Sequence, residues 1–246
     1  MPAPRDRRGG PPRKPADLKR PPPKPRMGKA ATDAKLAEER ALVLSRHAVS
    51  RETVERLDAY VALLRTWQKS INLVSPATIP EIWTRHVEDG LVLGERAKGI
   101  VRWADLGSGA GLPGLILAIL LATREGAAVH LVESNAKKAA FLRTVARELA
   151  LPATVHASRI EDCGAVLSSV EAISARALAS LEDLFGLVAP NARPDTVYWF
   201  LKGRAHESEI TDAAAHWRFD MVKHASPVED GSVLLEIRSL ERLPAA

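Results

Sequence analysis

The spacing of apolar residues changes along the chain from a helical period to a strand period. Between about residues 34 and 71, apolar residues return every third or fourth position, which predicts amphipathic helices, one of them capped by Ser50. A further helix is expected over residues 81–93. Residues 33–100 are therefore predicted to form a helical lead-in.

From residue 101 onward, short β-rich runs alternate with helical stretches. The pattern predicts strands at 101–106, 129–133, 154–157, 172–175 and 196–201, with helices at 115–122 and 135–149. Two last runs, 219–224 and 232–237, lie so close together that they indicate an antiparallel hairpin. The sequence thus predicts a Rossmann-like α/β core over residues 101–246. It would be a doubly wound, mostly parallel sheet with a C-terminal antiparallel hairpin, binding ligands beyond the carboxyl ends of its strands.

Charge separates the first part of the chain from the rest. The first 30 residues contain ten Lys and Arg against two Asp, and nine of the 17 prolines, whereas the whole chain has a net charge of only +5. Residues 1–32 are therefore expected to form a disordered, basic, Pro-rich tail, and residues 33–246 a single domain. Such a tail suits polyanions through phosphate contacts, or it is a solubilising extension without a specific partner.

Composition excludes several classes of protein. The longest apolar run, residues 115–122, is far shorter than the roughly 20 residues that span a bilayer, and the N-terminus has no apolar signal-peptide core. The single cysteine, Cys163, cannot form an internal disulfide, and no cluster of His and Cys indicates a metal site. We expect a cytoplasmic protein without a metal.

The most informative segment is the glycine-rich turn at residues 105–114, which directly follows the first predicted strand of the core. Its glycines, Gly107, Gly109 and Gly111 among them, allow a tight turn and a close approach of a ligand to the backbone. The G-x-G-x-x-G spacing of dinucleotide-binding proteins is also present. However, Asp105 at the end of the strand would repel a pyrophosphate, whereas S-adenosylmethionine carries an ammonium and a sulfonium group. The acid therefore favours S-adenosylmethionine over NAD.

Two more acids follow the next two predicted strands. Glu133 is placed to accept hydrogen bonds from both hydroxyls of an adenosine ribose, and Ile160 and Glu161 are placed to flank the adenine. Singly, each acid has an ordinary alternative, a surface carboxylate or the first turn of a helix. Together, three acids at successive strand ends indicate a class I S-adenosylmethionine-dependent methyltransferase core.

Seven segments stand out by their order and spacing. They are INLVS at 71–75, RHVED at 85–89, DLGSGAGLPG at 105–114, ESNAKKAAFL at 133–142, SRIE at 158–161, ISARA at 173–177 and LKG at 201–203. Over about residues 50–240 the chain resembles the glucose-inhibited division protein B family, the bacterial 16S rRNA guanine-N7 methyltransferases. The resemblance implies methyl transfer from S-adenosylmethionine to N7 of a guanine in 16S rRNA, with cofactor contacts at Gly107, Leu112, Ile160, Glu161 and Arg176.

No general base is expected for such a reaction, because guanine N7 has a free lone pair at neutral pH. Catalysis would come mainly from holding the reacting atoms in line. Arg176 is the first candidate for this positioning, and since N7 must stay free, the arginine would contact the cofactor or guanine O6. Its structural alternative is an ion pair at a strand end.

Basic side chains near these segments are candidates for contacts with rRNA phosphates. They are Arg85, His86, Lys137, Lys138, Arg143, Lys202 and Arg204. The two neighbouring lysines have the alternative of a solvated helix face, and the histidine that of a packed helix residue. The expected partner is 16S rRNA or the small ribosomal subunit, with the target guanine unpaired or splayed from its stack, and a monomeric enzyme is expected.

Three other functions stay open at this point. A methyltransferase of similar core can act on a small molecule or a protein, and the fold can serve as a non-catalytic RNA-binding scaffold. The weakest alternative is an NAD-dependent oxidoreductase. Binding of S-adenosylmethionine, binding of NADH and acceptance of methyl groups by RNA distinguish them.

Overall fold

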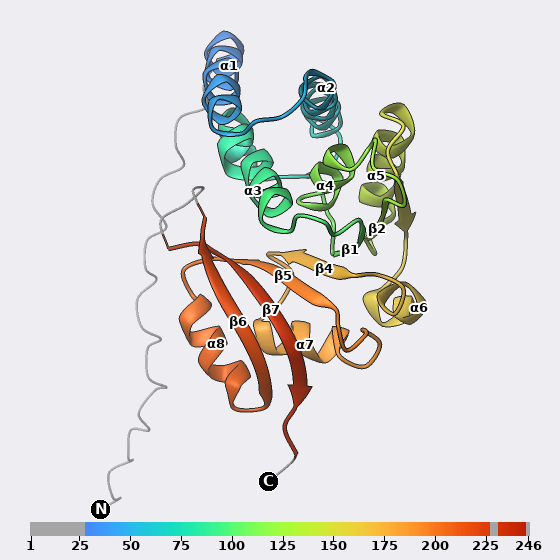
Figure 1. Ribbon diagram of the computed structural model, residues 1–246. Coiled ribbons are helices and arrows are strands. Elements are labelled where there is room, and N and C mark those ends of the chain that lie inside the picture. The colour runs from blue at the N-terminus through green and yellow to red at the C-terminus, as the bar shows by residue number, and fades with distance from the viewer. Residues whose placement is uncertain (1–27, 227–230, 245–246) are drawn as a thin grey trace, which may run out of the picture.

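The computed structural model describes residues 28–226 and 231–244, so the predicted basic tail up to residue 27 lies outside the described residues. Figure 1 shows a central sheet with helices on both of its faces. The helices are α1 (Lys29–Arg46), α2 (Arg51–Trp67), η1 (Pro76–Glu81), η2 (Trp83–Val87), α3 (Glu88–Arg96), α4 (Gly114–Leu120), α5 (Ala136–Glu148), η3 (Ile160–Cys163), α6 (Gly164–Leu167), α7 (Leu181–Val188) and α8 (His206–Ala214). The strands are β1 (Arg102–Leu106), β2 (Ala128–Val132), β3 (Ala153–His156), β4 (Ala172–Arg176), β5 (Val197–Lys202), β6 (Trp217–Ala225) and β7 (Val233–Arg242).

The sheet has the strand order β3-β2-β1-β4-β5-β7-β6. Strands β1 to β5 run parallel, whereas β7 is antiparallel to both β5 and β6. The predicted doubly wound sheet with a C-terminal antiparallel hairpin is thereby confirmed. Because the chain moves outward from β1 to β3 and then returns to β4, the order reverses between β1 and β4. Such a switch point opens a crevice at the carboxyl ends of the two strands, where ligands of open α/β sheets bind.

Two hydrophobic layers cover the sheet, one on each face. Along β1, Trp103 belongs to the layer beneath helices α1 to α5, and the next residue, Ala104, belongs to the layer beneath α6, α7 and α8. This follows from the two-residue period of a strand. All six residues of β5 are buried, as expected for a strand that is covered on both faces.

The helical lead-in is confirmed, but two of its details differ from the prediction. Helix α2 starts where expected, with the Ser50 hydroxyl accepting a hydrogen bond from the Thr53 amide at 3.2 Å. Helix α1 begins at Lys29, so residues 29–32, assigned to the tail, are helical; the Thr32 amide donates to the Gly28 carbonyl at 3.0 Å. The single helix expected over 81–93 is instead the end of a 3₁₀ segment, a π-helical turn and α3.

Candidate active site

The glycine-rich turn lies between β1 and α4, at the carboxyl end of the sheet. The Ser108 amide donates to the Val132 carbonyl of β2 at 3.0 Å, and the Gly111 amide donates back to the Ser108 carbonyl at 2.6 Å. Gly107 and Gly109 have φ values of +61° and +56°, which side-chain-bearing residues rarely adopt. A Cβ atom at Gly109 would meet nothing closer than the Gly107 carbonyl oxygen at 3.7 Å, so the space over this glycine is open to a ligand.

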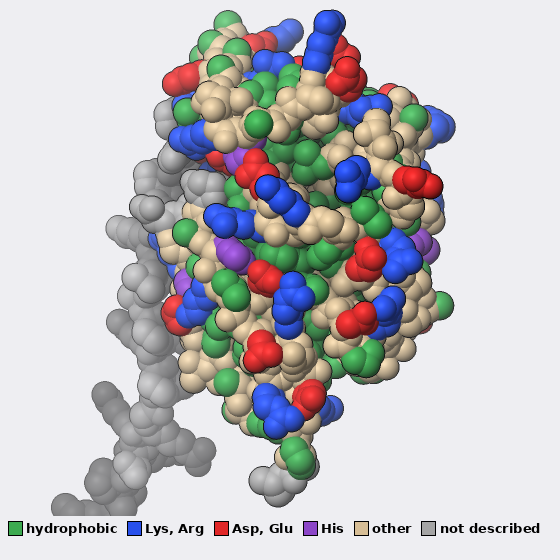
Figure 2. Space-filling model, in the orientation of Figure 1, with side chains coloured by type: hydrophobic (Ala, Val, Ile, Leu, Met, Phe, Trp, Pro, Cys, Tyr) green, Lys and Arg blue, Asp and Glu red, His purple; other side chains and the backbone are tan. Residues whose placement is uncertain are grey.

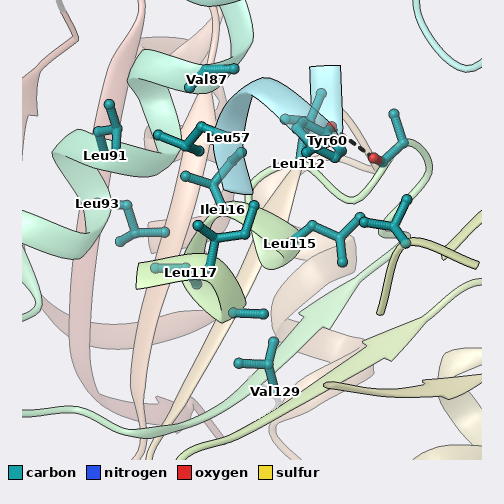
Figure 3. Close-up of a cluster of buried hydrophobic side chains, with 14 of the residues drawn as sticks. Leu57, Tyr60, Val87, Leu91, Leu93, Leu112, Leu115, Ile116, Leu117 and Val129 are labelled. Carbon is teal, nitrogen blue, oxygen red and sulfur yellow. Dashed lines mark hydrogen bonds between the residues drawn. The ribbon is translucent and has the colours of Figure 1, made fainter. Parts of the chain in front are cut away.

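Tyr60 of α2 holds the turn from the side of the helical lead-in. Its ring is fully buried, and its hydroxyl donates a hydrogen bond to the carbonyl of Ala110 at 2.9 Å, the dashed line in Figure 3. Burial raises the pKa of Tyr60, so the hydroxyl stays protonated and able to donate. Sequence reasoning did not single out this residue. The available signal was a tyrosine on the apolar face of α2, because a buried tyrosine hydroxyl needs a partner.

Asp105, predicted to border the cofactor, is buried beneath the turn. One carboxylate oxygen accepts from the Ser174 hydroxyl of β4 at 2.8 Å, and the other is buried against Gly114 without a well-aligned hydrogen bond from any described residue. Burial raises the pKa of Asp105 to about 6, although the hydrogen bond from Ser174 opposes this. The residue therefore supports the turn from inside and ties β1 to β4.

Glu133 stands at the end of β2 and braces the turn. It is only 7% exposed, so it is not the surface carboxylate of the alternative explanation. Oε2 accepts from the Gly109 amide at 2.8 Å, and Oε1 accepts from the Asn135 amide at 2.7 Å. An ionised carboxylate has about four acceptor positions, so each oxygen keeps capacity for one more donor. The two hydroxyls of a ribose fit that remaining capacity.

The next strand end contributes Ile160 and Glu161. Both lie in η3, after β3, where Ile160 is buried in the same hydrophobic layer as Leu106 and Val132. The Glu161 side chain is exposed and makes no hydrogen bond or ion pair with the residues that the structure describes. Since β3, β2 and β1 are neighbours in the sheet, the predicted residues after these three strands all lie at its carboxyl edge.

A cavity of about 290 Å³ opens on the other side of the switch point, at the ends of β4 and β5. It is lined by Arg85, Asp89, Arg176, Ala177, Ala179, Leu201, Lys202, Gly203, Glu209, Ser226, Ser232, Val233 and Leu234. Arg176 donates to the Arg85 carbonyl at 2.9 Å, and its Nη1 lies 3.2 Å from Oδ2 of Asp89. Burial raises the pKa of Asp89 to about 6, against the opposing effect of the Arg176 guanidinium. Sequence reasoning placed Arg176 here but did not single out Asp89 as a site residue.

The predicted RNA-contacting residues fall into two groups, and the first lies around this cavity. Lys202 is 8% exposed, with Nζ donating to the Ala179 carbonyl and to Glu209, both at 2.7 Å. Arg85 pairs with Glu81 at 3.2 Å. Burial, aided by the Arg176 and Arg85 guanidinium groups, lowers the pKa of His86 to about 3. The Lys202 ammonium group is thus already held within the protein, and His86 fits its alternative of a packed histidine, so RNA contact by either residue stays a prediction.

The second group lies on the outer face of α5. Lys137 and Arg143 are exposed and Lys138 is half-buried, and none of the three pairs with an acid among the described residues. By contrast, acidic and basic side chains alternate over the hairpin of β6 and β7 in Figure 2, where Arg238 pairs with Glu236. Arg204, also exposed, lies at the hairpin's far end against Gly231. We therefore expect the α5 face to attract a polyanion more strongly than the hairpin of β6 and β7 does.

Neither a metal centre nor a membrane span emerges from the described residues. Nowhere in residues 28–226 and 231–244 do three or more His, Cys, Asp or Glu side chains come together in a way that would hold a metal ion. Within the same ranges, no helix has the length and apolar character needed to cross a membrane.

Comparisons with known proteins point to one family. The family model described as rRNA small subunit methyltransferase G matches residues 53–233. The ribosomal RNA small subunit methyltransferases G of Brucella ovis and Brucella canis are each 48% identical to this chain over 195 residues, which is 79% of this chain and 92% of either relative.

Solved structures resemble the fold at low sequence identity. A methyltransferase from Geobacter sulfurreducens has a TM-score of 0.51 at 11% identity, covering 73% of this chain and 88% of its own. The E81Q mutant of MtNAS in complex with S-adenosylmethionine has a TM-score of 0.50 at 16% identity, covering 75% of this chain and 74% of its own. These likenesses bear on the fold alone.

Proposed function

This chain belongs to the rRNA small subunit methyltransferase G family, and on that premise we propose that it methylates N7 of a guanine in 16S rRNA with S-adenosylmethionine as the methyl donor. Membership of this family supports methylation of small-subunit rRNA as the reaction. The guanine N7 position and the choice of 16S rRNA are what the resemblance carried by the seven sequence segments implies.

The observation that carries the proposal is the Glu133 carboxylate, held between the amides of Gly109 and Asn135 at the switch point of the sheet. The residues present fit S-adenosylmethionine. Glu133 keeps acceptor capacity for the ribose hydroxyls, Ile160 offers an apolar contact for the adenine, and Glu161 an acceptor for its amine. The open space over Gly109 leaves room for the donor at the turn.

The bound donor would supply an activated methyl group, and the protein's own task is to position the acceptor. Guanine N7 needs no deprotonation, so orientation of the reacting atoms is worth on the order of 7–11 kcal/mol in favourable cases. Arg176 lies beside the turn, where Asp89 and the Arg85 carbonyl hold its guanidinium group. We assign it the positioning of the guanine.

For the rRNA itself, we propose the exposed α5 face as the phosphate-binding surface. Lys137 and Arg143 have no acid partner among the described residues, so phosphate contacts there would not have to break an ion pair. Lys138, on the same helix, extends this basic surface, and Arg204, at the end of the hairpin of β6 and β7, is proposed as a separate phosphate contact. Lys202 and His86 are left out, since one is paired and the other neutral.

The test uses labelled S-adenosylmethionine with 16S rRNA, or with small subunits that lack the modification. Digestion and mass spectrometry then detect and map 7-methylguanosine. We expect the wild-type protein to form it and Gly109→Ala to lose both product and calorimetric cofactor binding. Gly126→Ala is the matched control, because Gly126 also has a positive φ, +73°, and open space around it, but lies in the loop before β2 at the opposite edge of the sheet.

Each result of this test has its own interpretation. Both substitutions impose a left-handed conformation on alanine, at a cost of about 1–2 kcal/mol each, so a loss confined to Gly109→Ala shows that the turn binds the cofactor. Cofactor binding without any methylated rRNA would overturn the proposed acceptor, and absence of cofactor binding in the wild-type protein would overturn the methyltransferase itself.

A further inference from the structure

The cavity at the ends of β4 and β5 adjoins the glycine turn directly. In the pairing of β1 with β4, Leu106 lies opposite Ala175, so Gly107 and Arg176 follow at neighbouring positions. The Leu178 side chain lies against Gly107, close enough that a Cβ on this glycine would be 2.6 Å from it. Arg176 and Ala177, which line the cavity, therefore lie at the end of β4 directly beside the turn. A base at the mouth of the cavity would therefore lie directly beside a ligand on the turn.

Two ion pairs line the cavity, and they differ in distance and in how fully their charged groups are hydrogen-bonded. Lys202 and Glu209 meet at 2.7 Å, within the usual range for a charge-assisted hydrogen bond. Asp89 and Arg176 meet at 3.2 Å, and the second oxygen of Asp89 accepts from the Ser226 hydroxyl, also at 3.2 Å. Arg176 Nη1 is buried and makes no well-aligned hydrogen bond with the residues that the structure describes. The Asp89–Arg176 pair is therefore charged, largely buried and incompletely satisfied.

The hydrogen-bonding groups of the Asp89–Arg176 pair are complementary to guanine and not to adenine. Guanine presents an acceptor, O6, beside two donors, N1–H and the 2-amino group, whereas adenine presents a donor at position 6 and an acceptor at N1. An arginine beside a carboxylate offers the pattern complementary to guanine. When N7 faces the glycine turn, N1 and the 2-amino group point away from it, into the cavity.

We propose that Asp89 and Arg176 together select guanine as the acceptor, Asp89 accepting from N1–H and the 2-amino group and Arg176 donating to O6. This inference rests on the proposed function and names the groups that recognise its substrate. Asp89 has a second effect on the reaction. As the N7 lone pair forms the bond to the methyl carbon, the electrons of the breaking carbon–sulfur bond stay on sulfur, and the positive charge moves to the guanine. A carboxylate beside the ring stabilises that charge.

The test replaces the target guanine, mapped by the product assay above, with inosine, which lacks only the 2-amino group. The modified 16S rRNA is assembled from ligated fragments and offered as rRNA or as a reconstituted subunit, whichever the wild-type protein methylates. Losing one hydrogen bond to a charged group costs about tenfold to a hundredfold, so we expect wild-type kcat/KM to fall by this factor with inosine. In Asp89→Ala the guanine-to-inosine ratio should collapse to about 1.

Glu209→Gln is the matched control, because it alters the other acid of the same cavity and should keep the wild-type ratio. Asp89→Asn, of the same shape, repeats the measurement in case the alanine variant does not fold. Calorimetric binding of S-adenosylmethionine verifies the cofactor site in each variant.

Each result decides one of the two claims. A wild-type protein that methylates no rRNA would refute the proposed function itself. A wild-type protein that methylates guanine and inosine equally well, or an Asp89 variant that keeps the full preference for guanine, would refute the role of Asp89 while leaving the proposed function intact.

Discussion

Replacing Tyr60 by phenylalanine removes a single buried oxygen that links the helical lead-in to the glycine turn. The ring stays in the hydrophobic cluster of Figure 3, so no large cavity forms. What is lost is the 2.9 Å hydrogen bond to Ala110, whose carbonyl then stays buried without this donor. An unsatisfied buried acceptor costs about 1–3 kcal/mol. At about 2–4 °C per kcal/mol for a chain of this size, a 2 kcal/mol loss lowers Tm by about 4–8 °C.

The assay compares the thermal unfolding and the S-adenosylmethionine affinity of three proteins. Tyr198→Phe is the matched control: Tyr198 lies in β5, is buried, and its hydroxyl makes no hydrogen bond with any described residue. It should unfold close to the wild-type protein. Tyr60→Phe should unfold at a lower midpoint than the wild-type protein. It should also bind the cofactor about fivefold more weakly if about 1 kcal/mol of the lost free energy destabilises the conformation of the turn.

Equal stability of the two tyrosine variants would contradict the reasoning, because it would mean that the Tyr60 hydroxyl contributes no more than an unbonded one. A destabilised Tyr60→Phe with wild-type cofactor affinity would refute the second step alone. The bond would then support the fold without fixing the turn.

Three further predictions follow from groups at the site. Because burial raises the pKa of Asp105 to about 6, above its unfolded value of 3.8, the unfolding free energy should fall by up to about 3 kcal/mol as pH rises through 6, and Asp105→Asn should flatten that slope in urea titrations between pH 4 and 8. Glu133→Gln should weaken S-adenosylmethionine binding at least tenfold by calorimetry, since the amides of the turn and of α5 lose their charged acceptor. Lys137→Glu and Arg143→Glu should each lower rRNA affinity and the steepness of its salt dependence, whereas Arg51→Glu, an exposed arginine on α2, should change neither.

Much of the fold could be predicted from local patterns. The strands of the core were found because each has few residues, an apolar run and turn signals around it, and the hairpin because its two strands are close in sequence. Helices α7 and α8 were not singled out, since each has only eight or nine residues and neither follows a glycine-rich turn like the one that precedes α4. The π-helical turn before α3 was missed because nothing in its composition distinguishes it from an ordinary helix.

The site was predictable where the chain itself brings residues together and not where packing does. Gly107, Gly109 and Glu133 follow strands that are neighbours in any doubly wound sheet, so order in the sequence sufficed. Asp105 lies at the predicted strand end, but its burial beneath the turn could not be predicted, because it depends on the tertiary contact with Ser174 of β4. The Lys202 ammonium group was expected to contact an rRNA phosphate. In the structure it donates hydrogen bonds to Glu209 and Ala179, which only the tertiary fold brings close to it.

The residues that sequence reasoning missed share an origin: Tyr60 and Asp89 both come from the helical lead-in. Tyr60 holds the glycine turn through Ala110, and Asp89 holds Arg176 at the end of β4. The helices that precede the Rossmann-like core are therefore part of the candidate site, contributing to the glycine-rich turn and to the cavity beside it. Since both contacts reach the switch point from the same helical layer, a substitution that shifts α2 or α3 should disturb both, even without touching any glycine of the turn.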